Sequence, residues 1–306
     1  MARCLVTGHK GYIGSRLFKK LKDLGHDVQG IDLVDDDDIN EVAGLAENEF
    51  GNYIYAVSGD RPLLSNRWYD FKPEYIFHLA CIPRVMYSIE EPVKTMKNNV
   101  LAGSNVFNFA RKVGAKRVIY SSSSSIVGNG DGPESPYALQ KMTTEIECQL
   151  YAKLYDIDTV SLRYFNVYSF DQEVAGPYAT AVANWMHYIR EGKTPYITGD
   201  GEQRRDMLNV EDAVAANVFA MEYDGEFKGR VFDVGTGDNI SLNEMRSLVN
   251  EVFPNIKFDY VEPRSGDVLL TKADTTSLKA IGWEAKNTIK QGIKQCFETL
   301  KQQMEK

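Results

Sequence analysis

Short apolar runs alternate with helix-like segments along the first half of the chain. Runs of this length and composition are typical of buried strands, and they fall at Cys4–Thr7, Val28–Ile31, Ile54–Val57, Tyr75–Leu79, Val118–Ser121 and Thr159–Leu162. Between the first two runs, apolar residues recur on one face of a predicted helix, at Ile13, Leu17, Leu21 and Leu24. A second helix is expected at Val106–Val113, and Gly114 follows it as a stop. The alternation predicts an α/β fold, a doubly wound parallel sheet with right-handed crossovers.

This alternation weakens in the second half, after about Asn166. The patterns there predict loops and two further elements, at Ser169–Gly176 (loop), Gly199–Arg205 (loop), Val231–Val234 (strand) and Asn287–Lys306 (helix). We therefore expect two domains. The first is formed by residues 1–165 with a returning segment at about 207–235, and the smaller second one by residues 166–206 and 236–306.

The composition disfavours several classes of protein. The 306 residues carry a net charge of −8 and 43% of them are hydrophobic, so we expect a sizeable core and no nucleic-acid partner. No apolar run approaches the ~20 residues that span a bilayer, so no membrane association is expected. The N-terminus lacks the apolar core of a secretory signal, which favours a cytoplasmic protein. The 4 cysteines and 4 histidines show no metal-ligand spacing, so no metal site is expected, and an unsecreted chain is not expected to form disulfides.

A glycine-rich turn follows the first predicted strand. Gly8, Gly11 and Gly14 are spaced G-x-x-G-x-x-G between that strand and the first helix. Such a turn lets the backbone approach a pyrophosphate, and the helix N-terminus adds free N–H groups and a partial positive charge. Asp32 follows the second predicted strand, where a carboxylate can accept hydrogen bonds from both ribose hydroxyls and would repel a 2′-phosphate. The pattern predicts a dinucleotide site that prefers NAD to NADP.

A second candidate site combines the serine run Ser121–Ser125 with Tyr137 and Lys141. A spacing of four places Tyr137 and Lys141 on one face of a helix. An ammonium group beside the phenol favours the phenolate and lowers the pKa of the tyrosine from about 10. The phenolate can then take a hydroxyl proton while hydride leaves the same carbon, and a serine at the end of the sheet can bridge the two hydroxyls. These residues predict oxidation of an alcohol by a nicotinamide cofactor.

The order and spacing of the motifs resemble the extended short-chain dehydrogenase/reductases. Within that family the chain is most similar to nucleotide-sugar 4-epimerases, especially those acting on UDP-N-acetylglucosamine, and the similarity covers nearly the whole sequence. The stretches that carry it are TGHKGYIGSRL, HLA at His78–Ala80, NNV at Asn98–Val100, SSSSSIVG, SPYALQK, RYFNVYS at Arg163–Ser169, GPYATAV at Gly176–Val182, GDGEQRRD at Gly199–Asp206 and PRSGDV at Pro263–Val268. The resemblance implies a Rossmann-type NAD-binding domain, a smaller C-terminal substrate domain, a UDP-sugar substrate, and a homodimer paired through the helices at Asn99–Val113 and Tyr137–Tyr155.

The resemblance also implies a role for individual residues. Ser123 matches the catalytic serine, Tyr137 the base and Lys141 its partner. NAD would be held by Gly8, Gly11, Tyr12, Ile13, Gly14, Asp32, Asp60, Arg61, Leu79, Ala80, Asn98, Ser121, Tyr137, Lys141 and Tyr164. The UDP-sugar would be held by Arg84, Ser123, Asn166, Tyr178, Val182, Tyr196, Arg205, Arg264, Asp267 and Thr271.

Four of these residues match specific contacts of the family. Arg205 and Arg264 match two arginines that grip the diphosphate, where guanidinium groups make charge-assisted contacts. Asp267 matches a residue on the uridine ribose. Thr271 matches a position beside the 2-substituent of the sugar, which is a large tyrosine in members restricted to plain hexoses and a small residue in members that accept N-acetyl sugars. The resemblance therefore implies that N-acetyl sugars fit.

Two serines separate the possible reactions. Ser124 and Ser125 stand where related 4,6-dehydratases and UDP-glucuronate decarboxylases carry carboxylates, and a hydroxyl cannot replace a carboxylate as an acid–base group at neutral pH. We therefore expect NAD-dependent 4-epimerisation of UDP-GlcNAc and UDP-GalNAc, with UDP-glucose and UDP-galactose as further candidates. The alternatives are a UDP-glucuronate 4-epimerase or another nucleotide-sugar oxidoreductase, and a non-catalytic NAD-binding regulator, against which the intact Tyr137 and Lys141 argue.

Overall fold

The computed structural model describes residues 1–32, 67–128, 130, 132–172, 180–263 and 268–305. The predicted strand Ile54–Val57 lies outside this described part. The strands are β1 (Arg3–Thr7), β2 (Asp27–Ile31), β3 (Tyr75–His78), β4 (Arg117–Ser123), β5 (Asp158–Tyr164), β6 (Val167–Tyr168), β7 (Tyr196–Thr198), β8 (Arg204–Arg205), β9 (Leu208–Asn209), β10 (Arg230–Val234), β11 (Ile240–Ser241) and β12 (Asp259–Val261). The helices are α1 (Tyr12–Asp23), α4 (Arg67–Phe71), α5 (Val85–Glu90), α6 (Pro92–Met96), α7 (Ala102–Val113), α8 (Pro136–Tyr155), α9 (Ala181–Arg190), α10 (Val210–Glu222), α11 (Leu242–Val252), α12 (Thr276–Lys279) and α13 (Ile289–Met304), with a π-helical turn at Lys97–Leu101 and a 3-10 turn at Ser124–Ile126.

A six-stranded sheet organises the first part of the chain, in the order β10-β5-β4-β3-β1-β2. The pairs β1–β2, β1–β3 and β3–β4 are parallel, which confirms the predicted α/β class with a doubly wound sheet. The chain runs outward from β1 to β2 and then returns to β3 on the other side of β1. The carboxyl ends of β1 and β3 therefore flank the point where the strand order reverses, which is where such sheets bind ligands.

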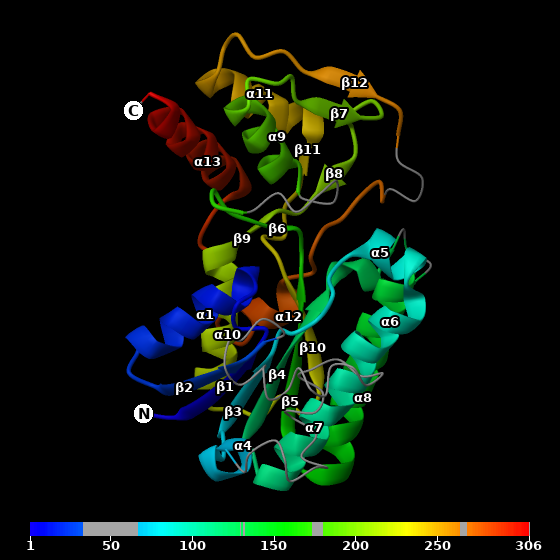
Figure 1. Ribbon diagram of the computed structural model, residues 1–306, viewed down its shortest axis with the longest axis vertical. Helices are drawn as coiled ribbons and strands as arrows, with labels where there is room; N and C mark the ends of the chain where they lie inside the picture. The colour runs from blue at the N-terminus through cyan, green and yellow to red at the C-terminus, as the bar shows by residue number, and fades with distance from the viewer. Residues whose placement is uncertain (33–66, 129, 131, 173–179, 264–267, 306) are drawn as a thin grey trace. The chain divides into compact units, whose positions relative to one another are not determined.

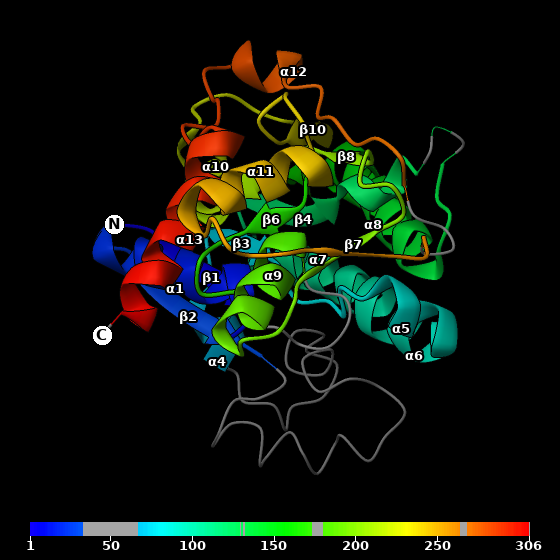
Figure 2. The ribbon, with the colours of Figure 1, turned by 90° about the horizontal axis from the view of Figure 1, so that it is seen from above.

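Helices cover both faces of this sheet (Figure 1). α7 and α8 pack on one face, and α1 and α10 lie on the other, as the view from above also shows (Figure 2). The core beneath α7 and α8 is aliphatic and aromatic, and it includes Ile76, Val106, Phe107, Val118 and Tyr120. On the opposite face the Cys4 thiol lies 3.8 Å from the sulfur of Met221. The sheet is thus buried on both sides, as its nearly continuous apolar strands require.

The chain divides into two compact units. The first consists of Met1–Ile126, Gly132–Arg163 and Val214–Phe232, and the second of Val127–Asp131, Tyr164–Ala213 and Asp233–Lys306. The segment that returns to the first unit is thus Val214–Phe232, shorter than the stretch at about 207–235 expected from the sequence.

The second unit packs α9, α11 and α13 around a core of its own, which includes Val182, Trp185, Met245, Val249 and Phe297. Its strands form short pairs: β6 with β9, β7 with β12, and β8 with β11. The stretch Gly199–Arg205, expected to be a loop throughout, ends in strand β8 at Arg204–Arg205. Its antiparallel pairing with Ile240–Ser241 involves residues far away in the sequence, which local patterns do not reveal.

Three further observations concern membrane-spanning helices, metal ligands and cysteines among the described residues. None of their helices combines the length and the apolar character needed to cross a membrane. Within the same described ranges, no group of three or more His, Cys, Asp or Glu side chains is arranged to hold a metal ion. The four cysteines, all described, are free thiols.

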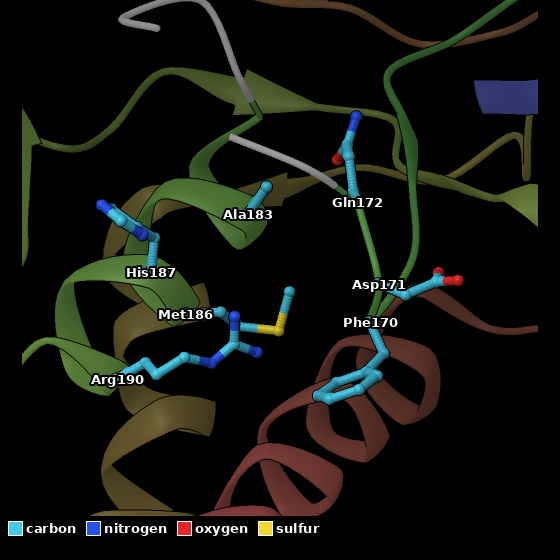
Figure 3. Close-up of a pocket in the computed structure, with 7 residues that line it drawn as sticks. All are labelled: Phe170, Asp171, Gln172, Ala183, Met186, His187 and Arg190. Carbon is cyan, nitrogen blue, oxygen red and sulfur yellow. The ribbon is translucent and has the colours of Figure 1, made fainter. Parts of the chain in front are cut away.

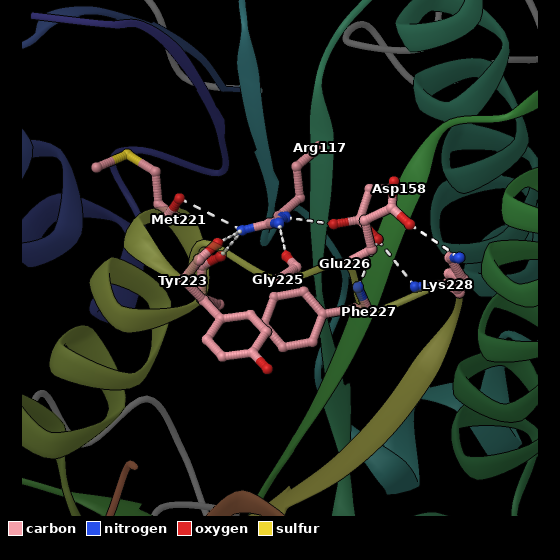
Figure 4. A network of polar contacts seen from close by, with 9 residues as sticks. Arg117, Asp158, Met221, Tyr223, Gly225, Glu226, Phe227 and Lys228 are labelled. Carbon is pink, nitrogen blue, oxygen red and sulfur yellow. Dashed lines mark hydrogen bonds and ion pairs between the residues drawn. The ribbon is translucent and has the colours of Figure 1, made fainter. Parts of the chain in front are cut away.

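A buried arginine ties the returning segment to the sheet (Figure 4). Arg117, the first residue of β4, donates from Nε to the Asp158 carboxylate at 2.5 Å. Its two terminal nitrogens donate to the backbone carbonyls of Ala220, Met221, Tyr223 and Gly225 at 2.6 to 3.4 Å. The guanidinium carbon also lies 4.7 Å from the centre of the Phe227 ring. Every nitrogen of this buried cation therefore has an acceptor.

We predict that Arg117→Met lowers the free energy of unfolding by ~3–5 kcal/mol, because it leaves the carboxylate of Asp158 and several carbonyls without their donor. Urea denaturation followed by circular dichroism measures the change. Arg230→Met is the matched control, since Arg230 stacks on Phe232 at 4.6 Å but is exposed. Equal losses in the two variants would show that the stacking, and not the buried hydrogen bonds, carries the stability.

Candidate active site

The glycine turn between β1 and α1 has no room for side chains. Gly8 has φ of +73°, and a Cβ there would lie 2.8 Å from the backbone nitrogen of Ala80, which follows β3. A Cβ on Gly14 would collide with the carbonyl oxygen of Gly8. Because these atoms are backbone, the turn could not yield to a larger residue. The strand-order reversal and the glycine spacing thus bring the backbones after β1 and β3 together.

This turn fits the pyrophosphate of a dinucleotide. Gly11 is the N-cap of α1, and among the described residues no side chain caps the helix and no acidic residue occupies its first turn. The N-terminus therefore keeps its N–H groups and its positive dipole end for an anion. Asp32 lies beside the turn, where Oδ2 accepts a hydrogen bond from the Lys10 nitrogen at 2.9 Å. A carboxylate at this place suits the ribose of NAD and disfavours the extra phosphate of NADP.

The other residues predicted to hold NAD lie at several points. Leu79 and Ala80 follow β3, and their nitrogens donate to the carbonyl and the hydroxyl of Thr7, each at 3.2 Å. Asn98 lies in the π-helical turn and donates to the Lys94 carbonyl at 2.9 Å. Tyr164 ends β5 and is buried. Asp60 and Arg61 lie outside the described residues.

Tyr137 is fixed at the first turn of α8. The Ser135 hydroxyl caps this helix by accepting from the Ala138 nitrogen at 3.2 Å, and the Ser88 hydroxyl accepts from the Tyr137 nitrogen at 3.0 Å. The side chain of Tyr137 is 8% exposed, and its hydroxyl hydrogen-bonds with Ser123, the last residue of β4. Burial raises the pKa of Tyr137, as does the nearby Cys81 thiol, whereas the hydrogen bond with Ser123 lowers it. A base at this position needs a positive charge close by.

Lys141 lies in the next turn of α8. Its Nζ donates to the Ser121 carbonyl at 2.7 Å and lies 5.9 Å from the centre of the Tyr137 ring. The structure therefore brings Ser121, Ser123, Tyr137 and Lys141 together at the carboxyl end of β4. A hydroxyl-bridged tyrosine beside an ammonium group can remove a proton from an alcohol.

Sequence reasoning missed Glu145, which lies one turn beyond Lys141 on the same face of α8. Glu145 accepts a hydrogen bond from Ser122 at 2.6 Å and two from Arg163 at 2.7 Å each, so its buried carboxylate is fully paired. Glu145 follows Lys141 by four positions, as Lys141 follows Tyr137. The signal that could have found it is the extension of the same helix face by one more turn.

Asn99 was missed as well, and it fixes the loop after β3. Its side chain accepts from the Ile82 nitrogen at 2.7 Å and donates to Gln140 at 2.7 Å. Gln140 in turn donates to Thr95 at 2.9 Å. The loop that bears Cys81 is therefore held against α8. Arg84 follows that loop as the exposed N-cap of α5.

Three residues of the second unit form a compact cluster. The Asn166 amide donates to the Asp206 carbonyl at 2.7 Å and to the Thr271 hydroxyl at 3.1 Å. The Asp206 nitrogen donates to Thr271, at 3.0 Å to its carbonyl and at 3.2 Å to its hydroxyl. Because a carbonyl can only accept, the amide orientation of Asn166 is fixed. Both N–H bonds of Asn166 are thus engaged, and it can donate to a diphosphate only by exchanging one of them.

The side chain of Asp206 ties this cluster to the neighbouring backbone. Its carboxylate, which is fully buried, accepts from the nitrogens of Thr236, Gly237 and Ala273 at 2.9, 3.0 and 3.1 Å, and from the Thr236 hydroxyl at 2.7 Å. Arg205 precedes it in β8, is half-buried, and donates to the Arg204 carbonyl at 3.0 Å. The hydrogen bonds of Asp206 therefore fix the backbone next to Arg205.

The remaining predicted substrate residues differ in accessibility. Tyr196 lies in β7, half-buried, with its ring 5.5 Å from that of Tyr188. Val182 is fully buried in the core of the second unit, so only its backbone could face a ligand. Tyr178, Arg264 and Asp267 lie outside the described residues.

A cavity of about 470 Å³ opens in the second unit. In Figure 3, side chains of α9 line one side and Phe170–Gln172 the other. His187 and Arg190 contribute the basic groups and Asp171 the acidic one. No predicted site residue that the structure describes lines this cavity.

Comparison with known proteins identifies the family. Residues 4–235 match the model of the NAD dependent epimerase/dehydratase family. A UDP-glucose 4-epimerase of Mycolicibacterium smegmatis is 31% identical, over 97% of each chain, and a putative UDP-glucose 4-epimerase of Methanocaldococcus jannaschii is 30% identical, over 97% of this chain and 98% of the other.

Solved structures show the same likeness. A UDP-N-acetylglucosamine 4-epimerase of Methanobrevibacter ruminantium, in complex with UDP-N-acetylmuramic acid, superposes with a TM-score of 0.83 at 28% identity, over 99% of this chain and 98% of the other. A UDP-glucose 4-epimerase of Thermotoga maritima with UDP-glucose gives 0.82 at 28% identity, over 99% of each chain. With the glycine turn and the paired Tyr137 and Lys141 in place, the chain belongs to the NAD-dependent epimerase/dehydratase family, and NAD is its cofactor.

Proposed function

We propose that this protein is a 4-epimerase of UDP-sugars that acts on UDP-GlcNAc and UDP-GalNAc, with UDP-glucose and UDP-galactose as further substrates. The observation that carries the proposal is the arrangement of the half-buried Ser123 with the buried Tyr137 and Lys141 at the end of β4. It is supported by two relatives that match 97% of this chain and are named as a UDP-glucose 4-epimerase and a putative UDP-glucose 4-epimerase.

The chemistry follows from the properties of these groups. Tyr137, as phenolate, takes the proton of the 4-hydroxyl, and Ser123 holds that hydroxyl through its own. Lys141 stabilises the phenolate by its charge. When bound, NAD would supply the acceptor for the C4 hydride and the donor that returns it to the other face of the 4-ketone. Tyr137 then returns the proton, so substrate and product differ only in configuration at C4.

The neighbouring residues favour epimerisation over elimination or decarboxylation. Ser124 and Ser125 form the 3-10 turn directly after β4 and offer only hydroxyl groups. A 4-ketone formed here therefore meets no second acid–base pair from this turn. We propose that the second unit holds the nucleotide, with Arg205 and Arg264 on the diphosphate, Asp267 on the ribose and Tyr196 near the base.

UDP-glucuronate is the second candidate substrate, because Arg84 is an exposed cation beside the loop that bears Cys81 and could pair with a uronate carboxylate. A relative from Thermodesulfobacterium geofontis that is named as a UDP-glucuronate 4-epimerase is 27% identical. Incubation with UDP-GlcNAc, UDP-glucose and UDP-glucuronate in separate reactions, followed by chromatography, identifies the substrate. Net NADH formation would point to an oxidoreductase, and no reaction with any of the three to a non-catalytic NAD-binding protein.

Replacing the base tests the mechanism. We predict that Tyr137→Phe lowers kcat by ~10²–10⁴-fold, the usual contribution of a general base, while calorimetry shows UDP binding unchanged. Tyr151→Phe is the control, because it removes a hydroxyl from the same helix at a half-buried position that packs on Phe107. Retention of near-full activity by Tyr137→Phe would refute the assignment.

Substitution of Thr271 tests the substrate class. We predict that Thr271→Tyr lowers kcat/KM for UDP-GlcNAc and UDP-GalNAc by ~10-fold or more and spares UDP-glucose and UDP-galactose, because a ring that overfills the space for an acetamido group costs ~1–3 kcal/mol. Thr271→Ser keeps the hydroxyl that accepts from Asn166 and should preserve activity. Leu270→Tyr, at the exposed neighbouring position, controls for the added ring. Equal losses on all four sugars would remove the basis for this role of Thr271.

The proposal includes a homodimer. α8 carries an apolar stripe of Leu139, Ile146, Leu150 and Leu154, which share one helix face and are 44% to 62% exposed. A monomer would leave this stripe in water, and a second copy of the same helix would cover it. We retain the cytoplasmic location expected from the sequence as part of this proposal.

We predict that Leu150→Glu shifts the protein from dimer to monomer, because closing the interface would bury an unpaired carboxylate. Light scattering after size-exclusion chromatography measures the mass. Gln149→Glu adds the same charge at the adjacent exposed residue, off the stripe, and should leave the mass unchanged. A monomeric parent protein would contradict the dimer itself.

A further inference from the structure

The ammonium group of Lys141 is buried. The side chain is 3% exposed, and its Nζ donates a hydrogen bond to the Ser121 carbonyl. Within the part of the chain that the structure describes, no carboxylate lies within ion-pair distance of it. Glu145, one turn further along α8, is engaged by Ser122 and Arg163. Since burial of an uncompensated charge is strongly unfavourable, another group must stabilise it.

That group is the ring of Tyr120. The Lys141 Nζ lies over this ring, 5.0 Å from its centre. Its distance to the centre of the Tyr137 ring is longer, 5.9 Å. A cation over an aromatic face is attracted by the ring quadrupole, and more strongly when it is desolvated. The Lys141 ammonium thus lies within 6 Å of both ring centres.

The Tyr120 ring is held in place and stays neutral. It is 2% exposed, stacks on the His78 imidazole at 5.6 Å, and meets the edge of Phe107 at 6.4 Å. Burial raises the pKa of Tyr120 well above its ordinary value. Burial, with the charge of Lys141, lowers the pKa of His78 to about 3, so the imidazole adds no second positive charge behind the ring.

We propose that Tyr120 is a positioning residue for the reaction: the face of its ring takes the place of a carboxylate counter-ion and holds the charged Lys141 beside Tyr137. The inference rests on the proposed role of Tyr137 as the base. A carboxylate at this place would neutralise the ammonium group and weaken its effect on the phenolate. A ring stabilises the cation and leaves its charge available to Tyr137.

The test compares Tyr120→Phe, which keeps the ring, with Tyr120→Leu, which removes it. Phe107→Leu is the matched control, because it removes a neighbouring ring of the same cluster that meets the edge of Tyr120. Each variant is made with and without Tyr137→Phe, and the NAD-loaded proteins are titrated by their ultraviolet phenolate absorbance. The difference within each pair isolates the titration of Tyr137. Tyr120 is itself ionisable, and its phenol is absent from Tyr120→Phe as well as from Tyr120→Leu, so the comparison of these two variants separates the ring from the hydroxyl. The other ionisable groups around Tyr137 are Cys81, His78, Lys141 and the pair of Glu145 with Arg163, and these are unchanged in each comparison.

We expect the pKa of Tyr137 to rise by one unit or more in Tyr120→Leu, equivalent to a tenfold loss of phenolate at neutral pH. The acid limb of the kcat profile should move by the same amount, while Tyr120→Phe and Phe107→Leu remain near the parent. An unshifted titration in Tyr120→Leu, or an equal shift in Phe107→Leu, would overturn the proposal.

A second variant guards against a folding defect, and the titration is independent of the sugar substrate. If Tyr120→Leu fails to fold by circular dichroism, Tyr120→Met fills more of the same volume without a ring and is expected to show the same shift. The titration needs no sugar, so it also separates this proposal from the proposed function. A parent protein without epimerase activity would refute the latter, while the titration would still decide whether Tyr120 holds Lys141.

Discussion

The buried ammonium group of Lys141 needs groups around it that replace water. The Ser121 carbonyl accepts its hydrogen bond, and the rings of Tyr120 and Tyr137 lie close to it. β4 supplies Ser121 and Tyr120 as consecutive residues, and α8 supplies Lys141 and Tyr137 one turn apart. The packing of α8 on β4 is therefore what makes the proposed chemistry feasible.

Other buried charged side chains also have hydrogen-bond partners, in each case within their own unit. Glu145 is matched by Arg163 and Ser122, and Arg117 by Asp158 and four carbonyls. In the second unit, Asp206 collects three backbone N–H groups and a hydroxyl. Each of these ions joins segments that are distant in sequence, so the charges fix the arrangement of the chain as well as being stabilised by it.

Much of the fold, and the proximity of Tyr137 to Lys141, could be predicted from local patterns. The glycine turn and the Tyr137–Lys141 spacing are short-range features, and the strands between them are signalled by unbroken apolar runs. The contact of Tyr120 with His78 could not be predicted in this way, because it depends on the register of β3 with β4. The link from Asn166 to Thr271 likewise joins residues 105 positions apart. Two-residue strands such as β8 have no periodic pattern to reveal them.

The Arg117 network has a consequence for how the chain is made. The carbonyl partners of its guanidinium lie 103 to 108 residues further along the sequence, and β10, the outer strand beside β5, follows directly after them. A ribosome therefore delivers β4 long before the groups that complete its surroundings. Until Arg230–Val234 emerges, β5 is the edge strand of the nascent sheet, and before residues 220–225 emerge the Arg117 guanidinium lacks its carbonyl acceptors. During that interval water has to solvate the groups that the later segment will pair with.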